Sequence, residues 1–216
     1  MPHLTIPFSQ RWTVRLPVVA RKLDAAYADA FFRDGSLRLS SFTTFRRHPD
    51  ESRRDGREGT VAMEIAAPDG TLSVLGVAAQ EAYVLCASIS DQGLTTTSER
   101  GTYIRVLDTV AFAAAVARQI PGCVGGVEGP CRYSTDTVVR KSGARSIQPP
   151  KDFADVDSWF HEQNAYVGEQ SVDALFLKDA KFAHEAEYRF IWFAEGTRRD
   201  FLDICCPAAV RFCERG

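Results

Sequence analysis

The spacing of hydrophobic residues predicts a mixture of strands and helices in the first half of the chain. Apolar residues recur three and four positions apart in Ala20–Arg33, as on one face of a helix, and Gly35 follows as a stop signal. A period of two in Leu37–Phe42 is typical of a strand with one buried face. Further strands are expected at 11–19, Thr60–Ala66 and Thr71–Val77, with turn residues at 68–70.

The second half of the chain contains one strongly apolar segment and two segments rich in turn-forming residues. Tyr83–Ala87 is almost continuously apolar, so Glu81–Ser90 is predicted to be a central strand. Cys123–Gly129 is rich in glycine but fits no phosphate-binding frame, and it is predicted to be a turn. Lys141–Asp155 combines prolines, a glycine and net positive charge, and predicts an exposed loop. The other predicted elements are strands at Thr102–Leu107, Cys131–Val139, Phe182–Phe193, Phe201–Cys206 and Val210–Cys213, and helices at Val110–Arg118 and Val156–Val167.

This order of elements predicts the α+β class. About eight or nine strands and about three helices that do not strictly alternate favour a central mixed or antiparallel sheet with flanking helices. A length of 216 residues fits one domain, spanning 1–216, better than two.

Composition and charge exclude several classes of protein. The net charge of −2 and the pI near 6.1 give no global attraction to nucleic acid or to anionic membranes. The first residues lack the pattern of a signal peptide, and no apolar run approaches the roughly 20 residues of a membrane helix, so a cytoplasmic protein without membrane contact is expected. The spacing of the six cysteines does not match a zinc site, and no metal site is predicted from them.

The clearest candidate for chemistry is the segment Leu175–Phe193. If Phe182–Phe193 is one strand, Glu185, Glu187 and Arg189 line one side, and the aromatic residues at 188, 190 and 192 line the other. Burying ionisable groups on a strand costs free energy of folding, so such groups are expected to be paired with opposite charges or to have a functional role. One interpretation is an ion network that includes Lys178. The other is that Glu187 is a catalytic carboxylate beside a cleft, where it would stabilise positive charge on a sugar.

A second candidate is the charged segment Phe45–Gly59. Its five arginines (46, 47, 53, 54 and 57) stand beside four acids, Asp50, Glu51, Asp55 and Glu58. Either this is a solvated loop, or arginines such as Arg46 and Arg54 bind a phosphate, since guanidinium groups fit phosphate well. Ser88 and Ser90 form a weaker candidate, at the expected end of the central strand.

Two segments resemble a widespread bacterial family of unknown function. The run from Lys178 to Arg189 resembles its K-x₃-[WF]-x₂-E-x-E-[YW]-R signature. Upstream, a second hallmark, F-R-x₄-E followed by R-x-D-x-x-E-G, is resembled by Phe45-Arg46 and Glu51, then Arg53 or Arg54, Asp55, Glu58 and Gly59. The resemblance covers roughly 30–215 and conveys little about activity.

The order of three motifs also resembles ADP-ribosyltransferases of the arginine–serine–glutamate class. An early arginine, Arg15 or Arg11, precedes Ser88-x-Ser90, which precedes Glu185-x-Glu187. This resemblance implies that the arginine holds the phosphates of NAD, that the serines position the nicotinamide ribose, and that Glu187 stabilises the oxocarbenium ion. The middle motif is S-I-S, a departure from the S-T-S of that class. The expected catalytic residues are therefore Glu187, Glu185 and Arg189, and the expected NAD-binding residues are Arg15, Arg46, Arg54, Ser88, Ser90 and Lys178.

Three functions follow as hypotheses. The first is an NAD-consuming ADP-ribosyltransferase or NAD glycohydrolase, in the manner of a toxin or phage-defence effector, with a protein or nucleic acid as acceptor. The second is a non-catalytic module that binds a nucleotide or nucleic acid through the arginines of 46–57. The third is a metal-dependent phosphodiester hydrolase that uses Asp55, Glu58, Glu185 and Glu187.

Overall fold

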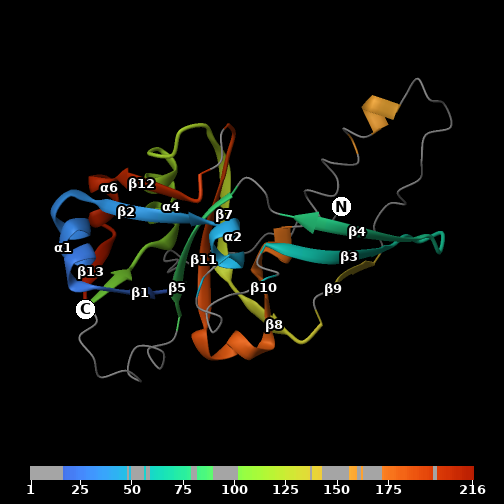
Figure 1. Ribbon diagram of the computed structural model, residues 1–216, viewed down its shortest axis with the longest axis horizontal. Coiled ribbons are helices and arrows are strands. Elements are labelled where there is room, and N and C mark those ends of the chain that lie inside the picture. Colours follow the sequence, from blue (N-terminus) through green and yellow to red (C-terminus); the bar gives the residue numbers. More distant parts are fainter. Residues whose placement is uncertain are drawn as a thin grey trace, which may run out of the picture.

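A computed structural model of the chain describes residues 17–47, 49, 56, 59–78, 82–89, 102–136, 138–142, 156–159, 162, 172–196 and 199–216. Within them, a large antiparallel sheet carries helices on one face and a smaller sheet on the other (Figure 1). The predicted α+β class is confirmed. No helix of the described residues is long and apolar enough to cross a bilayer.

The large sheet contains eight strands. Its continuous order is β12-β2-β5-β1-β6-β13, and β11 pairs with β5 on one side and β7 on the other. The strands are β1 (Val19–Leu23), β2 (Ser36–Ser41), β5 (Ala82–Ser88), β6 (Thr102–Val106), β7 (Cys123–Pro130), β11 (Glu187–Ala194), β12 (Phe201–Cys205) and β13 (Cys213–Arg215).

The two edges of β5 are used differently. Along one edge it pairs with β11 over its whole length, from Ala82 opposite Phe193 to Ser88 opposite Glu187. The other edge is shared, because β2 pairs with it near its start and β1 pairs with it only at Ser88. Strands β1 and β2 therefore separate along β5, and a gap in the ladder opens between them.

The main hydrophobic core lies between the large sheet and the helices α1 (Ala25–Asp34), α4 (Thr109–Ala117) and α6 (Pro207–Val210). Tyr188, Phe190 and Trp192 of β11 all belong to this core, as their period of two predicts. Ile191 points to the opposite face and packs with Phe42 of the short helix α2 (Phe42–Arg46). The two faces of β11 therefore have different surroundings, and Glu187 and Arg189 share the face of Ile191.

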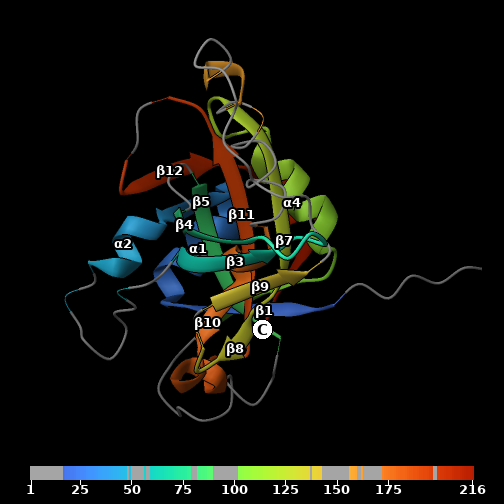
Figure 2. The ribbon, with the colours of Figure 1, turned by 90° about the vertical axis from the view of Figure 1, so that its right-hand side faces the viewer.

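The smaller sheet lies on the face of β11 away from α1, α4 and α6 (Figure 2). It consists of β4 (Leu72–Ala78), β3 (Thr60–Ala66) and β9 (Val138–Ser142), with β3 in the middle. Its buried residues, among them Met63 and Ile65, pack against the segment formed by the 3-10 helix η2 (Val172–Phe176) and β10 (Leu177–Asp179). Strand β10 pairs in parallel with β8 (Arg132–Ser134).

Several predicted elements are confirmed and several are wrong. Helix α1 ends at Gly35, whose φ of 78° permits the left-handed turn, as predicted. The predicted start of this helix is wrong, because residues 19–23 form β1 and the helix begins only after Asp24. The predicted glycine-rich turn at Cys123–Gly129 is also wrong, because it forms β7, paired along β11.

The remaining differences concern the second half of the chain. The predicted strand Phe182–Phe193 is divided, because Ala180–Glu185 form the 3-10 helix η3 and the strand begins at Glu187. The strand predicted at Cys131–Val139 is two strands, β8 and β9, and Val210–Cys213 spans the end of α6 and the first residue of β13. Of the loop predicted at 141–155, Lys141 and Ser142 belong to β9, and the rest lies outside the described residues. Of the helix predicted at 156–167, the described residues 156–159 and 162 are helical.

Candidate functional site

Four charged side chains from three consecutive elements meet at the start of β11. Lys178 comes from β10, Glu185 from the end of η3, and Glu187 and Arg189 from β11. Local sequence explains the sharp entry into β11: the carboxylate of Asp179 caps η3 by accepting from the backbone N–H of Lys181 at 3.0 Å. At the other end of η3, Ala186 adopts φ 43°, which turns the chain into the strand.

The four charges form one ion network. The Lys178 ammonium donates to Oε2 of Glu185 at 2.6 Å and to Oε2 of Glu187. Nε of Arg189 donates to the other oxygen of Glu187, Oε1, at 2.5 Å, and its Nη1 donates to the carbonyl of Leu175 at 2.6 Å. The side chains of Lys178, Glu187 and Arg189 are 8%, 6% and 1% exposed, whereas that of Glu185 is 36% exposed. Glu185 is therefore the member of the network that faces solvent.

The network keeps Glu187 ionised. Burial alone would raise the pKa of Glu187, but the nearby charges of Arg189 and Lys178 outweigh it and lower the pKa to about 2. Glu187 therefore carries a negative charge at any physiological pH. In the described geometry this charge is balanced by the two cations.

Two side chains from the segment before β8 and from β8 itself complete the surroundings of Glu187. The Tyr133 hydroxyl accepts from the backbone N–H of Glu187 at 2.6 Å, and burial raises the pKa of Tyr133 to about 12. The Cys131 thiol donates to Oε1 of Glu187 at 3.7 Å. Tyr133 therefore remains a neutral phenol that fixes the first residue of β11.

An aromatic ring, that of Phe182, lies beside the ammonium of Lys178. The ammonium of Lys178 lies 4.8 Å from the centre of the Phe182 ring, and that of Lys181 lies 4.6 Å from it. Phe182 itself is buried. Two carboxylates and an aromatic ring make this a favourable place for a cation, and Lys178 is the cation that occupies it.

The strand register brings three residues into one row. Ala20 of β1 is opposite Ser88 of β5, and Ser88 is opposite Glu187 of β11. Arg21, the next residue of β1, donates from Nη1 to the carbonyl of Cys86 at 2.6 Å, on the edge of β5 where β1 and β2 separate. Burial lowers the pKa of Arg21, and the charge of Glu187 acts against this shift. Arg21 therefore lies within the electrostatic reach of Glu187.

Arg21 is the residue that the sequence interpretation missed. The expected arginine was Arg15 or Arg11, and both lie outside the described residues. A helix was predicted to start at Ala20, which concealed the alternation of buried Val19, half-buried Arg21 and half-buried Leu23 in a strand. That period of two was the signal that could have identified Arg21.

Five of the predicted site residues are brought together: Lys178, Ser88, Glu185, Glu187 and Arg189. Ser88 reaches the group because its hydroxyl donates to the carbonyl of Glu185 at 2.8 Å. The expectation that Glu185 shares the strand with Glu187 is wrong, since Glu185 ends η3, yet both carboxylates meet at Lys178.

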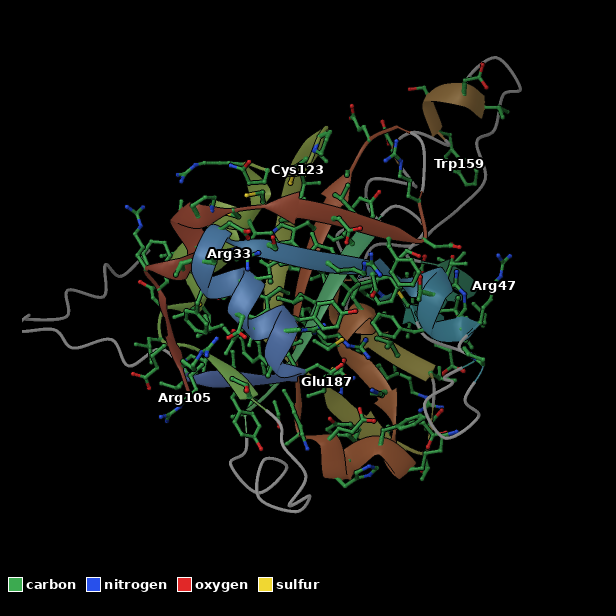
Figure 3. The ribbon with its side chains drawn as sticks, turned by 60° about the vertical axis from the view of Figure 1, so that its left-hand side comes forward. Arg33, Arg47, Arg105, Cys123, Trp159 and Glu187 are labelled. Atoms are coloured by element: carbon green, nitrogen blue, oxygen red, sulfur yellow. The ribbon has the colours of Figure 1, made fainter. Side chains whose placement is uncertain are left out.

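The charged early segment is only partly described. Arg46 lies in α2 and donates from Nη2 to the Thr43 hydroxyl at 2.9 Å. At the start of α2, the ring of Phe42 lies 6.0 Å from the guanidinium of Arg189, so this helix begins on the same face as the ion network. Arg47, at the end of α2, projects from the surface, whereas Glu187 lies among the strands (Figure 3). Arg54, Ser90, Asp55 and Glu58 lie outside the described residues.

A separate pocket of about 300 Å³ lies on the helix face, between α4 and β7. Small residues line much of it, including Ala113, Ala117 and Gly126, together with the ring of Trp192. Glu128 lies at its wall, accepts from the Thr109 hydroxyl at 2.9 Å through Oε1, and has a buried Oε2 without a hydrogen bond. Burial raises the pKa of Glu128. Because Trp192 and Glu187 point to opposite faces of β11, this pocket is not beside the ion network.

The carboxylates of the ion network are engaged by cations in the described geometry. Among the residues that the structure describes, no group of three or more histidine, cysteine, aspartate or glutamate side chains could hold a metal ion. The arrangement offers instead a carboxylate with a lowered pKa, Glu187, with Ser88 on the neighbouring strand β5 and Arg21 on β1, beyond β5. The carboxylate of Glu187 can stabilise a positive charge that develops next to Oε2, once the Lys178 ammonium that occupies this oxygen has moved.

No family model, curated protein or solved structure matches this chain. The resemblances seen in the motifs of Lys178–Arg189 and of Ser88–Ser90 therefore stay predictions, and function is argued from the geometry of the site.

Proposed function

We propose that this protein consumes NAD, as an ADP-ribosyltransferase or NAD glycohydrolase, and that Glu187 stabilises the ribosyl cation. The observation that carries the proposal is the row across three strands in which Ala20, Ser88 and Glu187 lie opposite one another, with Arg21 next to Ala20 in β1 and bonded to the carbonyl of Cys86 in β5.

The reaction needs little covalent chemistry from the protein. The bond between ribose C1′ and the nicotinamide nitrogen breaks, and both electrons leave with nicotinamide, which becomes neutral. The ribose then carries the positive charge until water or an acceptor group donates an electron pair to C1′ and loses a proton. A carboxylate that is already ionised and held by neighbours stabilises that charge without reorganisation. The low pKa of Glu187 supplies this condition at neutral pH.

Lys178 must move for this chemistry to occur. Its ammonium occupies Oε2 of Glu187, which is the position that the ribosyl cation would take. Glu185 already accepts from the same ammonium and is more exposed, so it can retain Lys178 while Oε2 of Glu187 becomes free. In this proposal Arg21 attracts the phosphates of NAD and Ser88 holds the backbone ahead of Glu187 in position.

The test is the release of nicotinamide from NAD by the purified full chain, followed by chromatography. Removing one well-placed electrostatic group from an active site lowers kcat by about 10²–10³. Glu187→Gln should therefore lose at least that factor, whereas Glu214→Gln, in an exposed ion pair, should retain wild-type release. Circular dichroism checks that both variants fold. If the wild-type protein releases no nicotinamide and modifies no acceptor, the proposal is wrong.

A second candidate, a non-catalytic nucleotide-binding module, is favoured by one observation. Both oxygens of Glu187 are already engaged by Lys178 and Arg189, as in a purely structural ion network. In that case calorimetry would detect binding of NAD without turnover. Glu187→Gln would then change the stability of the protein and leave the affinity for NAD unchanged.

A further inference from the structure

The turn that leads into β11 contains a strained residue. Ala186 has φ 43° and ψ 47°, and it is the only residue other than glycine with a positive φ in the part of the chain that the structure describes. A left-handed alanine is strained because its Cβ lies too close to the following carbonyl oxygen. Such a conformation persists only where neighbouring contacts hold it, and strained residues of this kind are frequent in switch segments. The contacts on the two sides of Ala186 therefore decide whether the strain can be released.

The ammonium of Lys178 joins the two sides of the strained residue. It donates to the carboxylates of Glu185 and Glu187, which precede and follow Ala186. On the side of η3, the Ser88 hydroxyl donates to the carbonyl of Glu185 at 2.8 Å. Without the ammonium, the two carboxylates would face each other across a strained turn, so Lys178 holds the turn closed.

The strand side of the turn is held more firmly than the side of η3. The carbonyl of Ala186 accepts from the N–H of Ile89 at 2.9 Å, and the N–H of Glu187 donates to the Tyr133 hydroxyl at 2.6 Å. Glu187 then continues into β11, which pairs with strands on both of its edges. Glu185, in contrast, ends a 3-10 helix and is the more exposed of the two acids. If the turn relaxes, we expect Glu185 to move and Glu187 to stay.

We propose that Ala186 is a strained hinge whose relaxation uncovers Oε2 of Glu187. When φ of Ala186 returns to the negative region that alanine prefers, the end of η3 moves and Glu185 moves with it. Because the ammonium of Lys178 also bonds Glu185, it follows that carboxylate and leaves Oε2 of Glu187. The described geometry is the closed state, and the strain lowers the free energy needed to open it. The role of the hinge in NAD binding rests on the proposed function, whereas the hinge motion itself does not.

The test is amide hydrogen exchange of the full chain, measured by NMR without any ligand. The N–H of Ala186 bonds the carbonyl of Ala183 at 3.3 Å, on the side that moves, whereas the N–H of Ile89 bonds the carbonyl of Ala186, on the side that stays. After correction for intrinsic rates, the Ala186 amide should exchange faster than the Ile89 amide, because it exchanges through the local opening. Equal rates would mean that the turn opens only together with the sheet, and the proposal would be wrong.

Ala186→Gly tests the strain. Glycine relieves the closed state, so the amide of residue 186 should exchange about two- to tenfold more slowly, the effect of left-handed strain less the extra freedom of glycine when open. The Tm should rise for the same reason. The matched control is Ala183→Gly, the same change in η3 at a residue without a positive φ, which should lower the Tm and should not slow this amide. A higher Tm with unchanged exchange in Ala186→Gly would overturn the proposal.

Lys178→Met tests the contact that holds the turn closed. It removes the ammonium between the carboxylates and should speed exchange at Ala186 at least about tenfold, since breaking a deeply buried ion pair costs more than that factor. Lys181→Met is the matched control, because the ammonium of Lys181 lies 4.6 Å from the centre of the same Phe182 ring but outside the ion network. It should leave exchange at Ala186 unchanged. Equal acceleration in the two variants would contradict the role of Lys178.

Nicotinamide release separates the hinge from the proposed function. If the proposed function holds, Ala186→Gly should lower the rate of release by the factor by which it slows exchange, because fewer molecules are open. Unchanged release in this variant, despite slower exchange, would show that the hinge does not free Glu187 and would overturn the proposal. If the wild-type protein releases no nicotinamide, the proposed function is wrong, and the exchange rates still decide whether the hinge exists.

Discussion

At the scale of single residues, desolvation distinguishes the network around Glu187 from the ion pairs of the surface. Arg38 and Asp203 form two hydrogen bonds, at 2.7 and 2.9 Å, but their side chains are 60% and 66% exposed. Water competes for the hydrogen bonds of that pair, and exposed ion pairs contribute at most about 1 kcal/mol to the free energy of unfolding. Glu187 is almost fully withdrawn from water, so the compensation of its charge comes from Lys178 and Arg189, and the Cys131 thiol adds one weak hydrogen bond.

The first prediction concerns Lys178. Lys178→Met keeps most of the side-chain volume against Phe182 but removes the ammonium from Glu187, so it should lower the free energy of unfolding by roughly 3 kcal/mol. The equivalent change at the surface, Arg38→Met, should cost less than about 1 kcal/mol. Urea denaturation of both variants at neutral pH measures the difference. If both variants lose the same small amount of stability, water reaches Glu187 and the prediction is wrong.

The second prediction concerns pH. The pKa of Glu187 in the folded protein, about 2, is below the value near 4.3 expected in the unfolded chain. The folded state therefore binds fewer protons, and the ionised network stabilises the protein at every pH above about 4.3. This contribution, roughly 3 kcal/mol, should be lost as the pH falls from about 4.3 to about 2. Denaturation at a series of pH values checks it: Glu187→Gln should be less stable than wild type at pH 7, and the gap should close in acid. A gap that stays constant would contradict the low pKa.

At the scale of elements, the junction of α1 and β2 depends on a residue without a side chain. Gly35 has φ 78°, and a Cβ at this position would overlap the backbone of Cys206 and Pro207. Its carbonyl also accepts from the N–H of Cys206 at 2.9 Å. The third prediction is that Gly35→Ala destabilises the protein by at least about 3 kcal/mol, because left-handed strain adds to a backbone clash.

Gly70 provides the matched control for Gly35. Its φ is 85°, but a Cβ there meets nothing within 4 Å. Gly70→Ala should therefore lower the free energy of unfolding by only about 1–2 kcal/mol, the strain of a left-handed alanine. Thermal denaturation of both variants separates the two causes. If both variants lose a similar amount of stability, the backbone at Cys206 moves away from the added Cβ at little cost, and the prediction for Gly35→Ala is wrong.

Local sequence predicted some elements well and others badly, for physical reasons. Helix α1 and its end were found because its apolar face and the stop at Gly35 agree, whereas its predicted start at Ala20 lies in β1. The division of Phe182–Phe193 was missed because the segment is strongly apolar and aromatic, whereas the break depends on the Asp179 cap and the left-handed Ala186. Strand β7 was missed because its glycines give no strand signal. They suit this place because a Cβ at Gly126 would lie 2.7 Å from the carbonyl oxygen of Ile191.

At the scale of the whole molecule, the sequence identified most residues of the candidate site but not how they lie relative to one another. The sequence placed Lys178, Glu187 and Arg189 within one short segment, so their meeting depends mainly on local structure. The position of Arg21 near Glu187 depends on pairing between β1, β5 and β11, which are far apart in the chain. The period of two around Arg21 indicates a strand, but it does not tell which strands this strand pairs with, because pairing follows from tertiary packing.

The smaller sheet also takes part in building the site, although it supplies none of the four charges. Buried Met63 of β3 packs with Ala174 and Leu177, and the same segment supplies the carbonyl of Leu175 to Arg189 and the ammonium of Lys178 to Glu187. The ion network is therefore held between β11 and a segment whose other side rests on the smaller sheet.

The fourth prediction tests this coupling. Met63→Ala should lower the free energy of unfolding by about 2–5 kcal/mol, because it opens a cavity in a fully buried cluster. Amide hydrogen exchange should accelerate in β3, β9 and β10, including the amide of Lys178, and less in β11, which also belongs to the main core. Arg140→Ala, on the exposed face of the same sheet, should leave these amides nearly unchanged. If Met63→Ala leaves exchange at Lys178 as slow as in the wild type, the segment is fixed by η3 and β8 alone. The smaller sheet would then be dispensable for the geometry of the ion network.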